Sequence, residues 1–186
     1  MAAVPVPVTE REIDDRRRLG IDKHDECWAG EWHLVNPPKL WHDRLNMRLL
    51  FALAPRAKAR GLEPHNGPVG IFGADNDWRV PDQIYFQPED AREEGVVSAE
   101  LVVEIRSPGD DSYKKLPFFA SRGVAEVMII HQDRRFELYR LNGEGHLVPA
   151  KPEDDGSVRS HVLDVAFTTV DGPRLRVEWD GGSAEV

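Results

Sequence analysis

The sequence predicts an α/β fold in which a mixed β-sheet is flanked by helices. Two apolar runs, Ala99–Arg106 and Val124–Gln132, are hydrophobic enough for central strands that are buried on both faces. The segment Ser112–Arg122 between them suits a helix, and a helical crossover makes the two strands that it joins parallel. The strands that precede Ala99 can pair as antiparallel neighbours, so we expect the sheet to be mixed.

The N-terminal segment carries signals for a helix and then a hairpin. Thr9 and Glu12 have the spacing of a capping box, which predicts a short amphipathic helix over Thr9–Leu19. The stretch Glu26–Val35 predicts two short strands joined by a turn at Ala29 and Gly30. The two prolines that follow end this hairpin, because proline lacks the backbone donor that a strand pair needs.

Two segments predict helices in the core of the fold. Apolar residues recur at helical spacing over Lys39–Ala59, and Pro55 is expected to end or kink this helix. In the second segment, Ser112–Arg122, Gly123 is placed for a helix C-cap. Pro117 disfavours a regular helix from its first residue, so this helix is expected to start later or to bend.

The rest of the sequence predicts a single domain with further strands, some of them at the edge of the fold. We expect one domain over residues 1–180 and a disordered tail over 181–186. The further strands are expected at Pro68–Ala74 and Trp78–Gln87, as a strand–turn–strand unit in Arg134–Ala150, and as added peripheral strands in Val162–Val170 and Leu175–Trp179.

The composition, the cysteine count and the net charge limit the kind of protein that this chain can be. The 186 residues are 40% hydrophobic and 31% charged, and the sequence holds no apolar run of transmembrane length, which predicts a cytoplasmic protein. Cys27 is the only cysteine, so neither an intrachain disulfide nor a cysteine zinc site can form. The formal net charge of −9 disfavours a nucleic-acid binder that relies on overall charge, although it permits a small basic cleft.

An acid inside the buried run is the most informative feature of the chain. Glu104 interrupts a strand that is otherwise apolar, and a buried carboxylate is costly unless it is paired or holds a metal ion. If the strand that carries Asp82 pairs with that of Glu104, the two carboxylates converge. Two carboxylates, the backbone carbonyl of Ile105 and waters suit Mg²⁺, with Mn²⁺ as a substitute. Lys115 would then stabilise negative charge or position a water molecule.

Each of these residues also has a structural interpretation. Glu104 could form a salt bridge with Arg106 or a lysine, and Asp82, which follows Pro81, could cap a bulge or an edge strand. Lys115 taken alone is typical of a solvated helix lysine. A helix histidine such as His42 is as often a packing residue as a catalytic one, and Glu26 taken alone is a weaker candidate still.

The combined spacing resembles the PD-(D/E)XK nuclease superfamily, in which a Pro-Asp strand, an acidic strand and a lysine build one metal site. It is most similar to a large bacterial family of restriction endonucleases in which the lysine has moved to the following helix. The match is carried by "WRVPDQIYF", "LVVEIRSPGDDSYKKLPFFASRGVAEVMII" and "DECWAGEWHLVNPPKLWHDRL", and it runs from Thr9 to Leu141. The resemblance implies a restriction-endonuclease-like mixed sheet.

The resemblance also implies roles for individual residues. Asp82 and Glu104 would be metal ligands, Lys115 the migrated catalytic lysine, Glu26 an additional acid near the metal, and His42 a helix residue that faces the cleft. Lys115 matches the family better than Lys114, because it lies four residues before Phe119, which stands where the family usually has tyrosine. The usual lysine position, two residues after the acid, is Arg106 here, so Arg106 or Lys115 supplies that charge.

These observations favour a metal-dependent endonuclease that hydrolyses DNA. A homodimer is a further hypothesis, because two sites are the simplest way to cut both strands of a duplex. The alternatives are a non-enzymatic protein that keeps the nuclease fold and binds a partner or nucleic acid, and a metal-dependent hydrolase of another phosphoester. A zinc enzyme is disfavoured, because the seven histidines show no His-x-x-x-His pairing.

Overall fold

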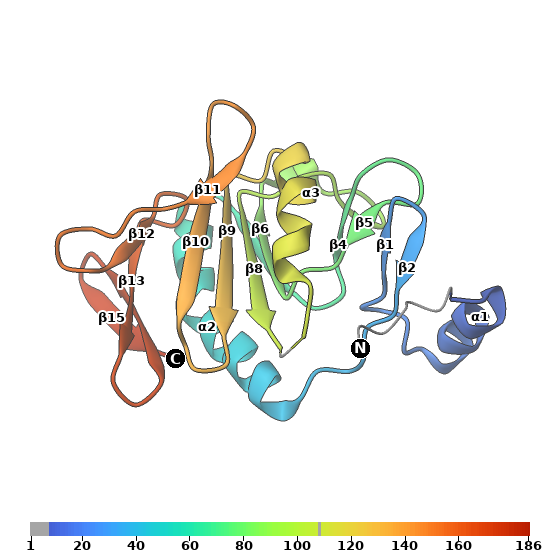
Figure 1. Ribbon diagram of the computed structural model, residues 1–186. Coiled ribbons are helices and arrows are strands. Elements are labelled where there is room, and N and C mark those ends of the chain that lie inside the picture. The colour runs from blue at the N-terminus through green and yellow to red at the C-terminus, as the bar shows by residue number, and fades with distance from the viewer. Residues whose placement is uncertain (1–7, 108) are drawn as a thin grey trace.

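A six-stranded mixed sheet forms the centre of the protein. The computed structural model describes residues 8–107 and 109–186 (Figure 1). The strands of this central sheet lie in the order β11-β10-β9-β8-β6-β3. Their bounds are Glu63–Asn66 (β3), Gln83–Phe86 (β6), Leu101–Arg106 (β8), Glu126–His131 (β9), Phe136–Leu141 (β10) and Leu147–Pro149 (β11).

The predicted strand directions are confirmed. Strands β8 and β9 are parallel, with Glu104 beside Ile129, and β6 pairs with β8 in the antiparallel sense. The segment between β8 and β9 holds a 3₁₀ helix, η2 (Ser112–Lys115), and a short helix, α3 (Leu116–Ser121). This crossover returns the chain to the same end of the sheet, as the parallel arrangement requires.

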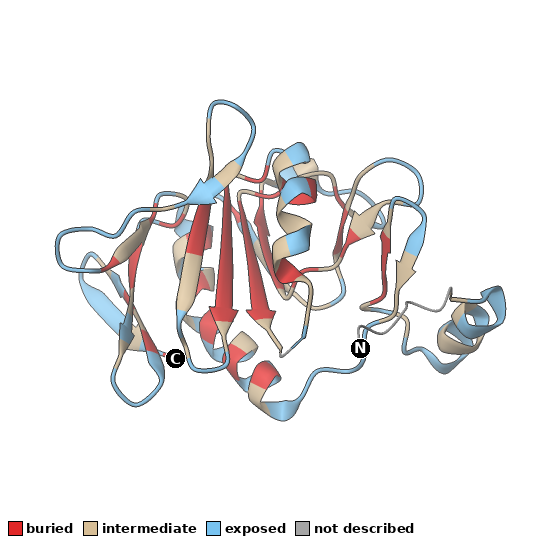
Figure 2. Ribbon diagram, in the orientation of Figure 1, coloured by how far each residue is buried: buried red, intermediate tan, exposed pale blue. Residues whose placement is uncertain are grey.

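Helices cover the two faces of the central sheet, and its inner strands β6, β8 and β9 are almost entirely buried (Figure 2). The long helix α2 (Leu40–Ala59) packs on one face, where Leu45 and Leu49 join a core cluster with Val103 and Ile105. Helix α3 packs on the other face, where its Phe119 lies in a second cluster. The alternation of side chains along β8 therefore places Glu104 on the face that α3 covers.

A second sheet lies beside the central one and contains the N-terminal hairpin. Its strand order is β2-β1-β5-β4-β7. The hairpin turns at Ala29 and Gly30, which both have positive φ, as the predicted turn requires. Helix α1 (Glu10–Leu19) begins with the predicted Thr9–Glu12 capping box. The strands are Glu26–Trp28 (β1), Glu31–His33 (β2), Gly70–Phe72 (β4), Trp78–Arg79 (β5) and Gly95–Val96 (β7), and a 3₁₀ helix, η1 (Pro88–Asp90), precedes β7.

The strand that was expected over Trp78–Gln87 is two strands in two different sheets. Strand β5 belongs to the second sheet and β6 to the central one, and the chain crosses between them at Val80–Asp82. Pro81 explains the break, because it has no backbone N–H to donate to a strand partner. The crossing places Asp82 directly before β6, at the boundary between the sheets.

The C-terminal residues form a third sheet, so the expected disorder of residues 181–186 is wrong. Its strands are Val158–Ser160 (β12), Val165–Val170 (β13), Arg174–Trp179 (β14) and Gly182–Glu185 (β15). Strand β15 pairs with β14, and Val186 is buried. The polar composition of the tail hid a strand whose partner is supplied by the tertiary fold. The predicted peripheral strands are present as β13 and β14.

Neither Pro55 nor Pro117 ends the helix in which it lies. Helix α2 continues past Pro55 to Ala59, so Pro55 does not end it. Pro55 is exposed, while Leu53 and Ala57 beside it are fully buried, so packing of the inner face outweighs the loss of one backbone hydrogen bond. Pro117 occupies the first turn of α3, where its missing donor costs little, and η2 takes the residues before it.

Within the part of the chain that the structure describes, no helix has the length and apolar character needed to cross a membrane.

Candidate active site

Asp82, directly before β6, lies opposite Glu104 of the neighbouring strand β8. Gln83 is paired with Val103, so Asp82, one residue earlier on the antiparallel chain, falls opposite Glu104. The backbone N–H of Ile105 donates to Asp82 Oδ2 at 2.6 Å, which fixes this carboxylate against the end of β8. Glu104 is buried at 5% exposure. Asp82 is close enough to Glu104 for its charge to raise the pKa of Glu104, so the structure brings the two acids to the same place in the sheet.

Lys115 lies between two buried carboxylates. Its Nζ is 3.1 Å from each carboxylate oxygen of Glu104 and 2.8 Å from Glu26 Oε1. Lys115 reaches them from the end of η2, directly before α3. The lysine that the family spacing singles out is thus the one that meets Glu104, while the neighbouring Lys114 is exposed and pairs with Asp111.

Glu26 comes from the N-terminal hairpin and joins the second sheet to the central one. The backbone N–H of Val80 donates to Glu26 Oε1, and the indole N–H of Trp28 donates to Glu26 Oε2, both at 2.8 Å. Because Val80 belongs to the crossing segment, Glu26 holds both that segment and Lys115. A residue that the sequence supported only weakly therefore contacts the centre of the cluster.

Helix α2 contributes His42 and Asn46 on the side of Asp82. His42 Nε2 lies 3.3 Å from Asp82 Oδ1, and the His42 side chain is buried. The amide of Asn46 donates to the Asp82 carbonyl at 3.4 Å and accepts from Gln83 Nε2 at 2.6 Å. Sequence reasoning missed Asn46 and Gln83. The available signals were the four-residue step from His42 to Asn46 and the position of Gln83 next to Asp82.

The cluster holds more negative than positive charge. Glu26 and Glu104 contact one ammonium group, that of Lys115, and Asp82 adds a third carboxylate close to Glu104. Burial raises the pKa of Glu104 to about 8, and Asp82 and Glu26 add to this effect while Lys115 opposes it. Burial lowers the pKa of Lys115, but the charges and hydrogen bonds of Glu104 and Glu26 outweigh it, so the net pKa is raised. A divalent cation would balance the excess charge.

The donor set fits a hard cation such as Mg²⁺. Asp82 and Glu104 offer carboxylate oxygens, and Ile105, whose carbonyl is the third expected donor, follows Glu104 directly on β8. In residues 8–107 and 109–186, no three His, Cys, Asp or Glu side chains form a group suited to a metal ion. Mg²⁺ needs only one or two carboxylates, because it keeps several of its waters.

The metal-free protein is expected to lose stability as the pH rises from about 5 to about 8. The folded pKa of Glu104, about 8, exceeds the ordinary value of 4.5, so the folded state keeps a proton that the unfolded chain releases. Although burial lowers the pKa of His42, hydrogen bonding to Asp82 raises it overall, which acts in the same direction. Melting temperatures measured in EDTA across this range test the expectation.

Glu104→Gln is the matched variant for that experiment, since glutamine keeps the volume of the side chain and cannot ionise. Its melting temperature should depend less steeply on pH than that of the wild type between pH 5 and 8. An equally steep fall in the variant would show that other groups carry the pH dependence.

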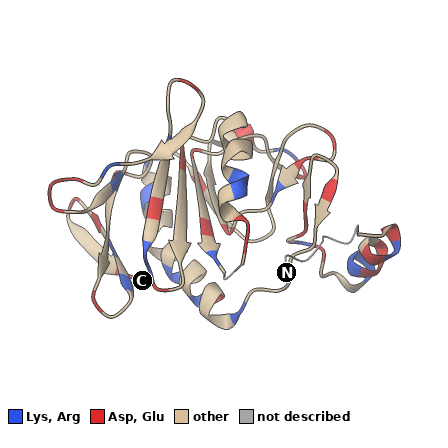
Figure 3. Ribbon diagram, viewed as in Figure 1, with Lys and Arg blue, Asp and Glu red and all other residues tan. Residues whose placement is uncertain are grey.

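Arg106 does not join the acids, although it stands at the usual lysine position. Its Nε lies 3.3 Å from Asp110 Oδ1, and its guanidinium carbon lies 5.0 Å from the centre of the Tyr113 ring. Acidic and basic residues meet at this end of β8, as the ribbon coloured by charge shows (Figure 3). The structure therefore separates the two candidates, with Lys115 in the acidic cluster and Arg106 beside it.

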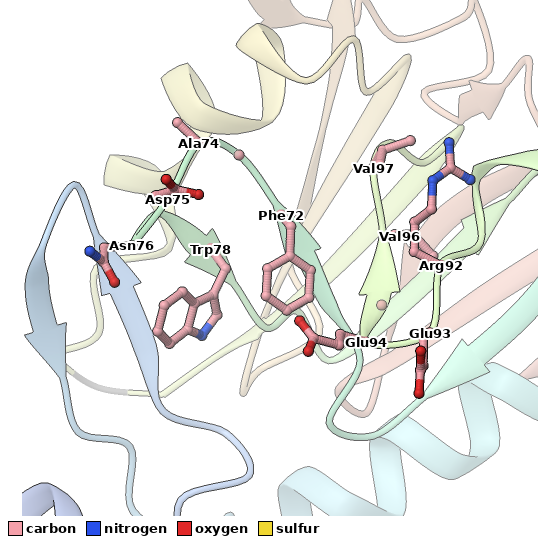
Figure 4. Close-up of a pocket in the computed structure, with 12 residues that line it drawn as sticks. Phe72, Ala74, Asp75, Asn76, Trp78, Arg92, Glu93, Glu94, Val96 and Val97 are labelled. Carbon is pink, nitrogen blue, oxygen red and sulfur yellow. The ribbon is translucent and has the colours of Figure 1, made fainter.

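A pocket of about 540 Å³ lies elsewhere, in the second sheet. Phe72 and Trp78 line it from β4 and β5, and Arg92, Glu93 and Glu94 line it from the segment before β7 (Figure 4). None of the predicted site residues borders this pocket. The buried charges mark the acidic cluster, and not this pocket, as the candidate site.

Comparisons with known proteins agree with this fold. A family model, Uma2, described as "Putative restriction endonuclease", matches residues 16–171. Among solved structures, the chain is similar to a "putative nuclease belonging to DUF820" from Anabaena variabilis ATCC 29413, with a TM-score of 0.60 and 17% sequence identity over 75% of this chain and 83% of that chain. No curated protein matches the chain. The structural likeness shows a shared nuclease fold.

Proposed function

The chain belongs to the Uma2 family, and on that basis we propose that it is a metal-dependent endonuclease that hydrolyses DNA phosphodiester bonds. One observation carries the proposal: Lys115 lies between Glu104 and Glu26, and Asp82 lies opposite Glu104, at the end of the central strand. A buried cluster with excess negative charge is costly to keep without a function. The matched region, residues 16–171, contains every member of this cluster.

In this proposal, Asp82, Glu104 and the carbonyl of Ile105 hold Mg²⁺, and Mn²⁺ can replace it. When bound, such an ion supplies Lewis-acid polarisation of the phosphate and a water molecule of lowered pKa. The backbone N–H of Ile105 keeps Asp82 oriented, and the register of β6 against β8 keeps the two carboxylates together. The site is rigid because its acids stand on or next to central strands.

The other residues act through charge and position. Lys115, held by Glu26, stabilises the negative charge that develops on the phosphate during hydrolysis. His42 orients Asp82 from the first turn of α2 and faces the same side of the cluster. The substrate is DNA, and we propose that a homodimer would place two such sites on the two strands of a duplex.

Isothermal titration calorimetry with Mn²⁺ and Mg²⁺ tests the metal site. Wild-type protein should bind the ions, and Glu104→Ala should lose most of that binding. A plasmid cleavage assay with Mg²⁺, Mn²⁺ or EDTA then tests the reaction, and nicked or linear product should form only with metal. Absence of both metal binding and cleavage in the wild type, with DNA present, would contradict the proposal.

A non-enzymatic nuclease-fold protein is the second candidate function. Lys115 already pairs with Glu104 in the structure, so the cluster can be read as a closed ion-pair network that stabilises the fold. The net charge of −9 also favours a protein partner over a long stretch of DNA. In that case the protein would bind no metal, and changes at Glu104 would alter stability alone.

A further inference from the structure

Next to Glu104, on the face of the central sheet that α3 covers, lies a group of three basic side chains: Arg106, His131 and Arg135. Arg106 follows Glu104 by two residues on β8, so both side chains project to the face that α3 covers. Arg106 is the register partner of His131 on β9. The backbone N–H of His131 in turn donates to the carbonyl of Arg135, at the turn into β10. Arg106 on β8, His131 on β9 and Arg135 directly before β10 are therefore neighbours.

These three residues line one pocket. Its volume is about 390 Å³, and its lining residues are Arg106, Ser107, His131, Gln132, Asp133 and Arg135. Two guanidinium groups, an imidazole, a hydroxyl and an amide can all donate hydrogen bonds, and Asp133 is the one acid in the lining. Such a set of donors suits an anion with several oxygens, and guanidinium groups match phosphate geometry especially well.

The acids near this pocket are committed to hydrogen bonds within the protein. Asp110, which faces Arg106, accepts from the backbone N–H groups of Ser107 and Ser112 and from the Ser112 hydroxyl. Glu137, which faces His131, accepts from the hydroxyls of Tyr113 and Tyr139.

The remaining acid, Asp133, pairs with Arg135 at 2.8 Å, but both side chains are more than half exposed, so this pair is weak in water. The Nε of Arg106 is buried and faces Asp110 Oδ1 at 3.3 Å. Tyr113 and Asp110 hold the guanidinium in place, and because the Arg106 side chain is 32% exposed, its terminal nitrogens are the donors that can reach a ligand.

We propose that this pocket binds a backbone phosphate of the substrate strand next to the phosphate that is cleaved, with Arg106 as the principal contact. The inference rests on the proposed nuclease function and extends it, because it assigns Arg106 to substrate binding and leaves the chemical step to Lys115. Consecutive phosphates along one strand lie several ångströms apart, and adjoining sites for two of them would fix the register of the strand on the acids.

The test measures DNA binding by fluorescence anisotropy, with Ca²⁺ in place of Mg²⁺ and with a range of KCl concentrations. Arg106→Gln should weaken binding of a labelled duplex about tenfold and lower the slope of log K against log salt by about one, as expected when one phosphate contact is lost. Arg106→Lys should keep the salt slope but recover only part of the affinity, because lysine cannot bind phosphate in the bidentate manner.

Arg176→Gln is the matched control. Arg176 also pairs with one acid, Glu185, but it lies on β14 of the third sheet. The Arg176→Gln variant should bind DNA with the affinity and salt slope of the wild type. Melting curves should show that both glutamine variants are folded.

Three results would overturn the inference in distinguishable ways. Equal affinity and salt slope for Arg106→Gln and wild type would remove the phosphate contact while leaving the nuclease proposal intact. Unchanged affinity with lost cleavage at saturating DNA would place Arg106 in the chemical step. Failure of the wild type to bind DNA and to cleave it would reject the proposed function as well.

Discussion

Glu104→Gln is expected to lower metal-dependent DNA cleavage at least about 10³-fold while the protein stays folded. Loss of a metal-ligand carboxylate removes several kcal/mol of transition-state stabilisation, and each factor of ten in rate corresponds to about 1.4 kcal/mol. Glutamine has the same shape, and it removes one charge from a cluster that has too many negative charges. The stability of the metal-free variant at pH 8 should therefore equal or exceed that of the wild type.

Glu126→Gln provides the contrast, because Glu126 is a second buried acid on a central strand but lies outside the site. Its carboxylate accepts hydrogen bonds from the Arg140 side chain, the Ser160 hydroxyl and the His161 backbone. This variant should be less stable than the wild type yet cleave at a normal rate when folded. If the two variants behave alike in plasmid cleavage, Glu104 has no special place in the mechanism.

Lys115→Met is expected to reduce the stability of the metal-free protein at pH 8 by about 3–5 kcal/mol, because it leaves two carboxylates buried without their cation. Glu104 and Glu26 both contact Lys115 directly, and the Lys115 side chain is 13% exposed, so water compensates little. A change of this size lowers the melting temperature of a protein of this length by roughly 10 °C. Cleavage should fall as well.

A second change separates charge from packing. The double variant that combines Lys115→Met with Glu26→Gln lacks one of the two unpaired acids. It should therefore be more stable than Lys115→Met alone. Lys114→Met is the surface control, since Lys114 is exposed and pairs only with Asp111, and it should change the melting temperature little. Equal melting temperatures for Lys115→Met and Lys114→Met would show that the buried ion pairs contribute nothing to the fold.

Local sequence signals anticipated the central strands and their directions. The apolar runs around Glu104 and Ile129, with a helical segment between them, were sufficient to predict parallel strands, and the structure confirms that pairing. The Thr9–Glu12 capping box is likewise present as predicted. These features depend on residues that are close in the chain, and local patterns carry such information.

Features that depend on distant partners were missed or misplaced. The run Trp78–Gln87 has the composition of one strand, but its two ends find partners in different sheets, with β1 and β4 on one side and β3 and β8 on the other. The tail 181–186 lacks a strand pattern of its own and becomes ordered by pairing with β14. Edge strands of this kind gain their stability from the neighbour, which the local pattern does not reveal.

For the candidate site, residue identity in the sequence singled out Glu104, because an acid in an apolar strand is costly, and the family spacing added Asp82 and Lys115. The tertiary structure decided which charges meet. It brought Glu26 to Lys115 from a hairpin almost 90 residues away in the chain, and it turned Arg106 toward Tyr113 and Asp110. Electrostatic energies depend on distance and burial, and both are set only when the two sheets and the crossover helix pack together.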